Sequence, residues 1–177
     1  STLATTRYFY NGFATTTHHS GHTGVPERSR MEIVNALGEL YIVVESGSRA
    51  LLYDYDALGN LTLTRNSAGN EITSTYNGLG QKIGMQDPDK GTFSYQYNAF
   101  GELYAQTDAE GTTTVNLMDF KGRRTTEVVS PRTGSTQAAF VNVWEYDRSA
   151  NGIGQVNKET KGATATEFTR ISTFDVL

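Results

Sequence analysis

Apolar and polar residues alternate along much of the chain, which is the period of a β-strand with two different faces. In Phe93-Ser94-Tyr95-Gln96-Tyr97 the three rings fall on one side, and residues 61–64 alternate Leu and Thr in the same way. No stretch of a dozen residues keeps the 3.6-residue period of an amphipathic helix. The pattern therefore predicts an all-β protein.

The predicted strands are separated by a turn that recurs every 21 residues. It consists of Asn or Asp, two further residues and Gly, and begins at Asn35, Asp56, Asn77, Asn98 and Asp119. The first side chain can hydrogen-bond the backbone two residues on, and glycine suits the left-handed conformation that follows a type I turn. A fixed period of this length indicates a repeat architecture. The residues that we expect to define the repeat are Tyr55, Asp56, Gly59, Tyr76, Asn77, Gly80, Tyr97, Asn98, Gly101, Asp119 and Gly122.

A second glycine follows each turn glycine by about ten residues, at Gly47, Gly69, Gly91, Gly111 and Gly134. One period is then two strands of about six residues and two tight turns, which predicts a meander of antiparallel hairpins. The third position of the first four turns is apolar, and we expect these side chains to fold onto the sheet as a plug. They are Leu37, Leu58, Leu79 and Phe100.

We expect one repeat array over residues 1–177. The regular repeats span about 34–134, and longer, irregular repeats span 8–33 and 135–177. Asn11 precedes Asn35 by 24 residues, whereas Asp147 follows Asp119 by 28 and Asp175 follows Asp147 by 28. Because the sequence begins with Ser1 and stops just before the next glycine is due, we expect it to be a piece of a longer array.

The stretch Tyr55-Asp56-Ala57-Leu58-Gly59-Asn60-Leu61 resembles the repeat of the Rhs/YD-repeat family, whose core is Tyr-Asp-x-x-Gly-Arg/Asn-Leu every twenty-odd residues. Residues 76–81 and 97–103 are close variants, and Arg123 matches the arginine that follows the family's glycine. The resemblance is strong over residues 34–130 and weaker over the rest of 8–177. It implies a curved, spiral sheet of hairpins that closes as a hollow shell.

Bacterial members of this family are large exported proteins: Rhs polymorphic toxins, wall-associated toxins and the B–C shell of Tc insecticidal toxins, and animal teneurins have a similar barrel. The resemblance implies a secreted or cell-surface location. It also implies two partners, the rest of the same shell and an enclosed C-terminal toxin or effector. The family's aspartate-protease core is not matched. We therefore expect a non-enzymatic module of the shell wall.

Composition excludes several other classes of protein. The formal net charge is −4, whereas a nucleic-acid binder would carry a basic excess. The absence of cysteine excludes disulfide scaffolds and thiol nucleophiles. The longest apolar run, residues 40–44, is far shorter than the roughly 20 residues that span a bilayer. We predict no membrane span and no cofactor.

Two groups of residues have metal-ligand chemistry. His18, His19 and His22 could bind a metal if their rings converged, but the sequence lacks the helical spacing of metalloproteases, and a solvated loop is the favoured interpretation. Residues 54–59 and 87–91 have closely spaced aspartates, without the glutamate that closes a calcium loop. Turn-forming aspartates explain them better, so we predict no metal site.

No catalytic residue is predicted. The acids lie mainly at turn positions, and no Gly-x-Ser-x-Gly elbow or phosphate-binding loop is present. An enzyme remains an alternative, and it requires a concave pocket holding two carboxylates with strongly shifted pKa values.

The equivalent tyrosines Tyr55, Tyr76 and Tyr97 are expected to form a ladder across neighbouring strands that stabilises the sheet. Exposed rings that bind glycans, as in a carbohydrate-binding or adhesion module, are the alternative function, and Trp144 with Tyr146 is a similar case. An excised array would also have open edge strands, so we expect this fragment to self-associate through them.

Overall fold

The structure, a computed structural model, describes residues 5–20, 26–47, 49–163 and 168–173. These residues form 15 β-strands and no helix, and the strands are hydrogen-bonded in chain order. The prediction of an all-β array of antiparallel hairpins is confirmed. Within the described residues, no helix is long and apolar enough to cross a membrane.

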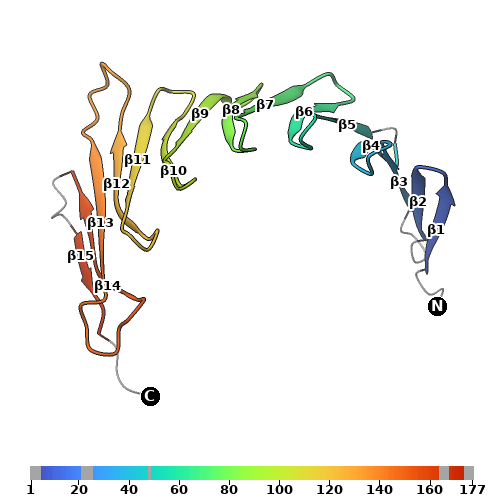
Figure 1. The fold of residues 1–177 in the computed structure, drawn as a ribbon. Coiled ribbons are helices and arrows are strands. Elements are labelled where there is room, and N and C mark those ends of the chain that lie inside the picture. The colour runs from blue at the N-terminus through green and yellow to red at the C-terminus, as the bar shows by residue number, and fades with distance from the viewer. Residues whose placement is uncertain (1–4, 21–25, 48, 164–167, 174–177) are drawn as a thin grey trace. The chain divides into compact units, whose positions relative to one another are not determined.

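The chain divides into two units, Ser1–Asp89 and Lys90–Leu177. In the first unit each strand pairs antiparallel with the next one in the chain (Figure 1). Its strands are β1 (Thr5–Asn11), β2 (Ala14–Ser20), β3 (Arg28–Val34), β4 (Leu40–Glu45), β5 (Arg49–Tyr55), β6 (Leu61–Asn66), β7 (Glu71–Tyr76) and β8 (Lys82–Asp87).

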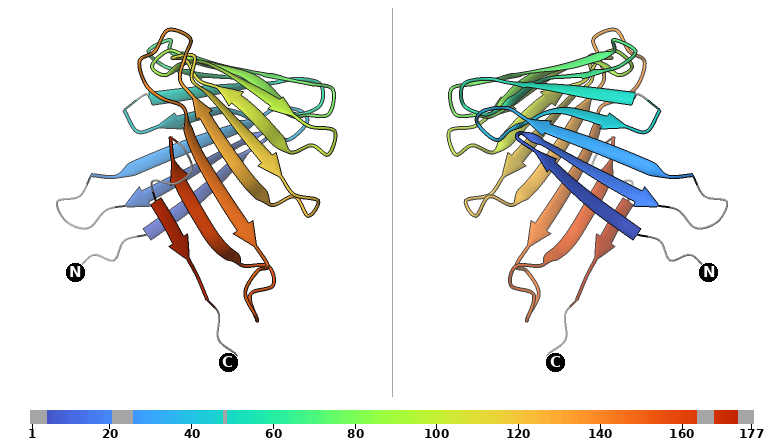
Figure 2. Two further views of the ribbon diagram at one scale, coloured as in Figure 1. Left: turned by 90° about the vertical axis from the view of Figure 1, so that its left-hand side faces the viewer. Right: turned by 90° about the vertical axis from the view of Figure 1, so that its right-hand side faces the viewer.

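The second unit repeats the same antiparallel pattern. Its strands are β9 (Gly91–Tyr97), β10 (Leu103–Thr107), β11 (Thr113–Met118), β12 (Arg124–Ser130), β13 (Phe140–Tyr146), β14 (Val156–Gly162) and β15 (Phe168–Ile171). Within each unit neighbouring strands are rotated relative to one another, as the right-handed twist of β-strands requires (Figure 2).

Because the strands run in chain order, the turns of each unit fall on two opposite edges. Turns from an odd to an even strand, such as β3 to β4 and β5 to β6, lie on one edge, which we call the tip edge. Turns from an even to an odd strand, such as β4 to β5 and β6 to β7, lie on the other, the return edge. The repeat turns that begin at Asn35, Asp56, Asn77, Asn98 and Asp119 are all on tip edges.

Each unit is a single layer with almost no apolar core. Val43 on β4 (1% exposed) and Ala105 on β10 (5%) are the only buried apolar residues in the described part of the chain. The sheet is therefore stabilised by backbone pairing and by side-chain pairs between adjacent strands. A sheet that covers neither face with another layer is unusual for a globular domain.

His18 and His19 are a correction to the sequence analysis, which favoured a solvated loop. Both lie on β2, where they pair with Arg7 and Thr6 of β1. Successive side chains of a strand point to opposite faces, so these two rings do not converge. His22 lies outside the described residues.

Candidate functional site

The five repeat turns share one backbone geometry. In the second repeat the Gly59 N–H donates to the Asp56 carbonyl at 3.0 Å, and the Asp56 N–H donates to the Asn60 carbonyl at 3.0 Å. Gly59 has a φ of 80°, and the other four turn glycines have values between 75° and 83°. The pairing of Tyr55 with Leu61 is shifted by one residue, as a bulge beside a left-handed glycine requires.

The first side chain of each turn binds the turn backbone. Oδ1 of Asp56 accepts the N–H groups of Leu58 and Asn60, each at 2.9 Å. The same two contacts recur around Asn35, Asn77, Asn98 and Asp119. Only a short side chain with an acceptor oxygen can reach both N–H groups, so Asn and Asp are interchangeable here.

The residue four positions later completes each turn, and its chemistry depends on the first residue. Where the first residue is Asn, its side-chain amide donates to an acceptor: Asn35 to Glu39, Asn77 to Gln81 and Asn98 to Glu102, each at 2.7 Å. Where it is Asp, a donor binds it: Asn60 Nδ2 lies 2.9 Å from Asp56 Oδ2, and Arg123 Nε lies 2.8 Å from Asp119 Oδ2. Each turn therefore holds a complementary donor–acceptor pair.

In the first, second and fourth repeat turns the same residue also lies close to the glycine of the next turn. A Cβ placed on Gly59 would lie 3.1 Å from Oε1 of Glu39, and one on Gly122 would lie 2.8 Å from Oε1 of Glu102. Glycine is thus favoured at Gly59 and Gly122 by the left-handed backbone, and the end of the preceding glutamate side chain would have to move to admit a Cβ.

The repeat tyrosines connect consecutive hairpins. Tyr55 Oη donates to the Leu40 carbonyl at 3.0 Å, and Tyr76 Oη donates to the Leu61 carbonyl at 2.9 Å. Each acceptor is the second residue after the preceding turn glycine. Burial, together with the charge of Glu39, raises the pKa of Tyr55, which keeps its hydroxyl protonated as a donor.

The predicted tyrosine ladder is wrong in one respect. Tyr55 lies on β5 and Tyr76 on β7, with β6 between them, so the rings are not on neighbouring strands. Two strands separate equivalent residues because one repeat is a whole hairpin. Tyr55 and Tyr76 therefore each donate to the backbone of the adjacent strand, and the two rings do not pair with each other.

The predicted apolar plug is also wrong. Leu37, Leu58, Leu79 and Phe100 are 80%, 70%, 83% and 89% exposed, respectively. The third residue of these turns points away from the sheet, because the hydrogen bonds to the first side chain face the strands. The apolar character of this position therefore has no explanation within the turn.

The fifth repeat turn is joined to the irregular repeat that follows it. Arg123 Nη2 lies 2.7 Å from Asp119 Oδ2 and 2.9 Å from Asp147 Oδ2. Its guanidinium stacks on the Tyr146 ring, 4.3 Å from the centroid, and Tyr146 Oη donates to the Arg124 carbonyl at 3.0 Å. Tyr146 thus makes the repeat tyrosine's contact despite the 28-residue spacing.

The hydrogen bonds of this cluster stabilise the charged forms of Arg123 and Asp147. The hydrogen bond from Arg123, followed by that from the Gly154 N–H, lowers the pKa of Asp147 well below its usual range. Hydrogen bonds to Asp147 and Asp119 raise the pKa of Arg123. Asp147 has a φ of 61°, unusual for a residue other than glycine, and the contacts to Arg123 and Gly154 hold it in that conformation.

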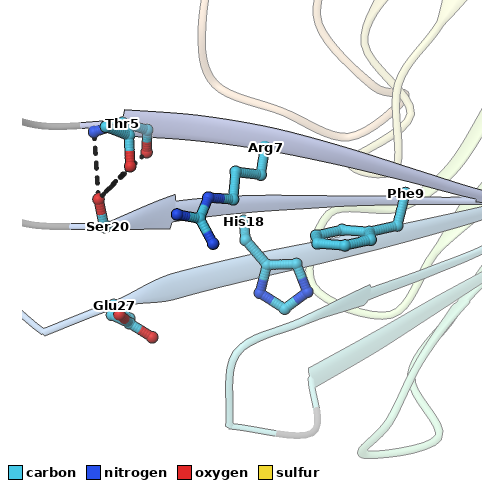
Figure 3. A pocket seen from close by; sticks show the side chains of 6 residues that line it. All are labelled: Thr5, Arg7, Phe9, His18, Ser20 and Glu27. Atoms are coloured by element: carbon cyan, nitrogen blue, oxygen red, sulfur yellow. Dashed lines mark hydrogen bonds between the residues drawn. The ribbon is translucent and has the colours of Figure 1, made fainter.

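A shallow hollow on the first unit contains His18 (Figure 3). The His18 ring lies edge-on to the Phe9 ring, with centroids 5.3 Å apart, and Arg7 stands opposite His18 on the adjacent strand. Thr5 and Ser20 are hydrogen-bonded to each other through their side chains at 2.7 Å. Across the described residues, no group of three His, Cys, Asp or Glu side chains is arranged to hold a metal ion.

The enzyme alternative requires a hollow that holds two carboxylates with raised pKa values. A hollow beside the first two repeat turns gathers Glu39, Asp54 and Asp56, but Glu39 accepts from Asn35, and the hydrogen bond from Asn60 lowers the pKa of Asp56. A general acid needs a raised pKa. Glu39 and Asp56 therefore act as hydrogen-bond acceptors within turns.

Comparison with known proteins identifies the repeat. The family model described as RHS Repeat matches residues 55–92, which hold two consecutive repeat turns. Residues 55–92 are thus similar to an RHS repeat. The resemblance to the Rhs/YD-repeat family is thereby confirmed. No curated protein matches the sequence.

Solved structures with a similar fold include Tc toxin proteins. The Tc holotoxin pore of Photorhabdus luminescens, carrying a TccC3-D651A mutation, has a TM-score of 0.69 at 12% identity and is matched over 87% of this chain and 9% of its own. The TcdB2-TccC3 complex has a TM-score of 0.57 at 12% identity, over 89% and 11%. The chain spans about a tenth of the solved chains that it matches.

Sequence reasoning matched Asn60 and Arg123 to the family's Arg/Asn position but missed what the residue four positions after the turn start does. Glu39, Asn60, Gln81, Glu102 and Arg123 look unrelated in sequence. The signal that could have found them is complementarity, since an acceptor follows each Asn and a donor follows each Asp.

Proposed function

We propose that this RHS-repeat chain is a non-enzymatic structural module, a stretch of the wall of a larger spiral shell. One observation carries the proposal: the described residues of each unit form a single layer with one buried apolar residue. Gly59, Gly80 and Gly122 lie close to a side chain of the preceding repeat turn. Tyr55 and Tyr76 donate to the backbone of the preceding hairpin. Such a module gains stability from its contacts with neighbouring repeats.

The finer proposal is that the shell encloses a C-terminal toxin or effector domain and that the whole protein is secreted or displayed on the cell surface. The RHS repeat and the Tc toxin structures with the same fold support it. A closed wall separates a passenger from proteases and from the cell that makes it, and leaves few free sheet edges.

The repeat residues listed in the sequence analysis have a structural role in this proposal. Asp56, Asn77, Asn98 and Asp119 form the turns, and the tyrosines join the hairpins. The regular array spans residues 34–134, with the longer repeats at 8–33 and 135–177 as adapted members of it. The glycan-binding alternative gains no support of its own, because the hydroxyls of Tyr55 and Tyr76 are bound to backbone carbonyls.

The test is protease protection of the passenger in the whole polypeptide that contains this sequence. We expect the C-terminal domain to survive a protease that degrades the same domain when it is produced alone. Equal cleavage of the two would contradict encapsulation. A glycan array with reproducible hits that Tyr76→Ala abolishes would favour the adhesion alternative instead.

A further inference from the structure

The one tryptophan of the chain lies beside a hollow on the second unit. Trp144 is on β13 and is partly buried. The hollow has a volume of about 370 Å³, which is within the roughly 300–1,000 Å³ of small-molecule sites. Besides Trp144 it is lined by Gln155, Val156, Glu159, Arg170 and Ser172. None of these residues belongs to a repeat turn, so the repeat does not explain the hollow.

The Trp144 ring is held in place by Arg124. The guanidinium of Arg124 stacks on the ring, 4.6 Å from its centroid. Arg124 is itself fixed, because its Nη1 donates to Glu127 Oε1 at 2.7 Å and to Asn116 Oδ1 at 3.4 Å. The hollow is lined by Trp144 but not by Arg124, so the guanidinium and the hollow meet different parts of the ring. The ring is therefore a preorganised surface for a ligand in the hollow.

A carboxylate and a guanidinium stand next to the ring on consecutive strands. Trp144 pairs with Glu159 of β14, and Glu159 pairs with Arg170 of β15, so the three side chains share one face of the sheet. Glu159 Oε1 lies 3.1 Å from Lys161 Nζ. Among the residues that the structure describes, the Arg170 side chain has neither an ion pair nor a hydrogen bond. Its donors are available to a ligand.

These groups together select the chemistry of the ligand. A flat ring binds an apolar face, and the polar groups at its edge, Gln155 and Ser172 included, bind hydroxyls. A pyranose with equatorial substituents has this shape, with C–H groups on its faces and hydroxyls around its rim. A nucleobase also stacks, but its phosphates require a basic surface, and the net charge of the chain is −4. An apolar peptide would find Val156 as the single aliphatic side chain of the lining.

We propose that the hollow beside Trp144 binds a glycan of the cellulose or chitin type, whose pyranose rings carry their substituents equatorially. One sugar ring stacks on Trp144, while Glu159 and Arg170 bind its hydroxyls. The site is separate from the repeat tyrosines Tyr55 and Tyr76, whose hydroxyls are bound to the backbone. It does not depend on encapsulation, because a shell wall can carry a binding site, and each of the two proposals can fail without the other.

Fluorescence of the intact chain tests the site directly, because Trp144 is its only tryptophan. Cellohexaose and chitohexaose are the probes, each titrated up to its solubility limit. We expect a saturable change in tryptophan emission with at least one of them. No change with either glycan would overturn the proposal. A response to a peptide or an oligonucleotide, and to neither glycan, would equally overturn the assignment to a sugar.

Two arginine variants locate the binding. Arg170→Gln removes the unpaired guanidinium of the hollow, and we expect it to weaken glycan affinity at least tenfold, as the loss of a charged hydrogen bond does. Arg148→Gln is the matched control, since Arg148 is exposed in the same unit and does not line the hollow. It is expected to leave the affinity unchanged. Equal affinities in the two variants, or calorimetric binding that survives Trp144→Ala, would overturn the proposal.

Discussion

In a repeat turn one small polar side chain satisfies two backbone N–H groups and also selects its partner four residues later. Asp56 binds the N–H groups of Leu58 and Asn60 and accepts from the Asn60 side chain. Asn77 binds the equivalent N–H groups and donates to Gln81. The two residues of each pair therefore have to change together.

A double-mutant cycle tests this coupling. Asn98→Asp removes the donor to Glu102 and places two carboxylates together, so it is expected to lower the free energy of unfolding by about 1 kcal/mol, the usual value of one hydrogen bond. Adding Glu102→Asn reproduces the pair found at Asp56 and Asn60, and we expect it to restore most of the loss. Urea unfolding of the four proteins measures the coupling, and strictly additive effects would contradict it.

The tyrosine hydroxyl is the second residue-scale contact. Tyr76→Phe leaves the ring and removes the donor to the Leu61 carbonyl, so we expect a loss of about 1 kcal/mol in the free energy of unfolding. Tyr41→Phe is the matched control, because Tyr41 is exposed on β4 and its hydroxyl has no hydrogen-bond partner within the described part of the chain. Similar losses for both variants in urea unfolding would count against the tyrosine contact.

At the scale of the hairpin, the turn glycine combines a left-handed backbone with contact to the preceding turn. Gly59→Ala is expected to destabilise the chain by about 1–2 kcal/mol, the cost of a left-handed residue with a Cβ, because φ is 80° and the added Cβ meets Glu39 at 3.1 Å. Gly78 is also a turn glycine, with open space around it and no positive φ. Gly78→Ala should therefore leave the melting temperature nearly unchanged, and a larger loss there than at Gly59 would refute this account.

The cluster around Arg123 makes the second unit sensitive to acid. A lowered pKa of Asp147 means that the unfolded chain binds its proton more readily than the folded one. The stabilisation is present above the unfolded pKa of about 3.9 and is lost as the pH falls toward the lower folded value. We expect Asp147→Asn to be less stable than the parent at pH 7 and to lose less stability between pH 5 and pH 3. Urea unfolding at the two pH values measures this, and an equal loss of unfolding free energy in the parent and in Asp147→Asn would contradict it.

Much of the structure of the hairpins could be predicted from the sequence. The 21-residue spacing of Asn or Asp and glycine predicted the turns between Asn35 and Gly122, since these residue types suit only a few backbone conformations. Side-chain direction could not be predicted in the same way. Leu58 looked like a core residue, because an apolar residue next to a strand usually packs on it, yet the turn hydrogen bonds direct it outward.

Contacts between repeats depend on the path of the chain and were inaccessible to pattern reasoning. Arg123 and Asp147 are 24 residues apart and meet only because the irregular repeat returns to the preceding turn. The strand location of His18 was missed for a related reason. Its polar surroundings suggested a loop, whereas pairing with β1 and β3 extends the sheet through them.

For the whole molecule, the central claim is that this chain is part of a wall. Each unit has paired strands, connected turns and nearly no core, so it lacks the second layer with which a sheet normally buries one face. In a shell the neighbouring repeats and the enclosed content would supply that cover.

The most direct test is a cryo-EM reconstruction of the whole polypeptide that contains this sequence. We expect residues 34–134 to appear as consecutive hairpins of one continuous single-layer sheet that bounds a cavity, with the turns at Asp56 and Asn77 on one edge. A compact domain in which these strands fold over one another around an apolar core would contradict the account.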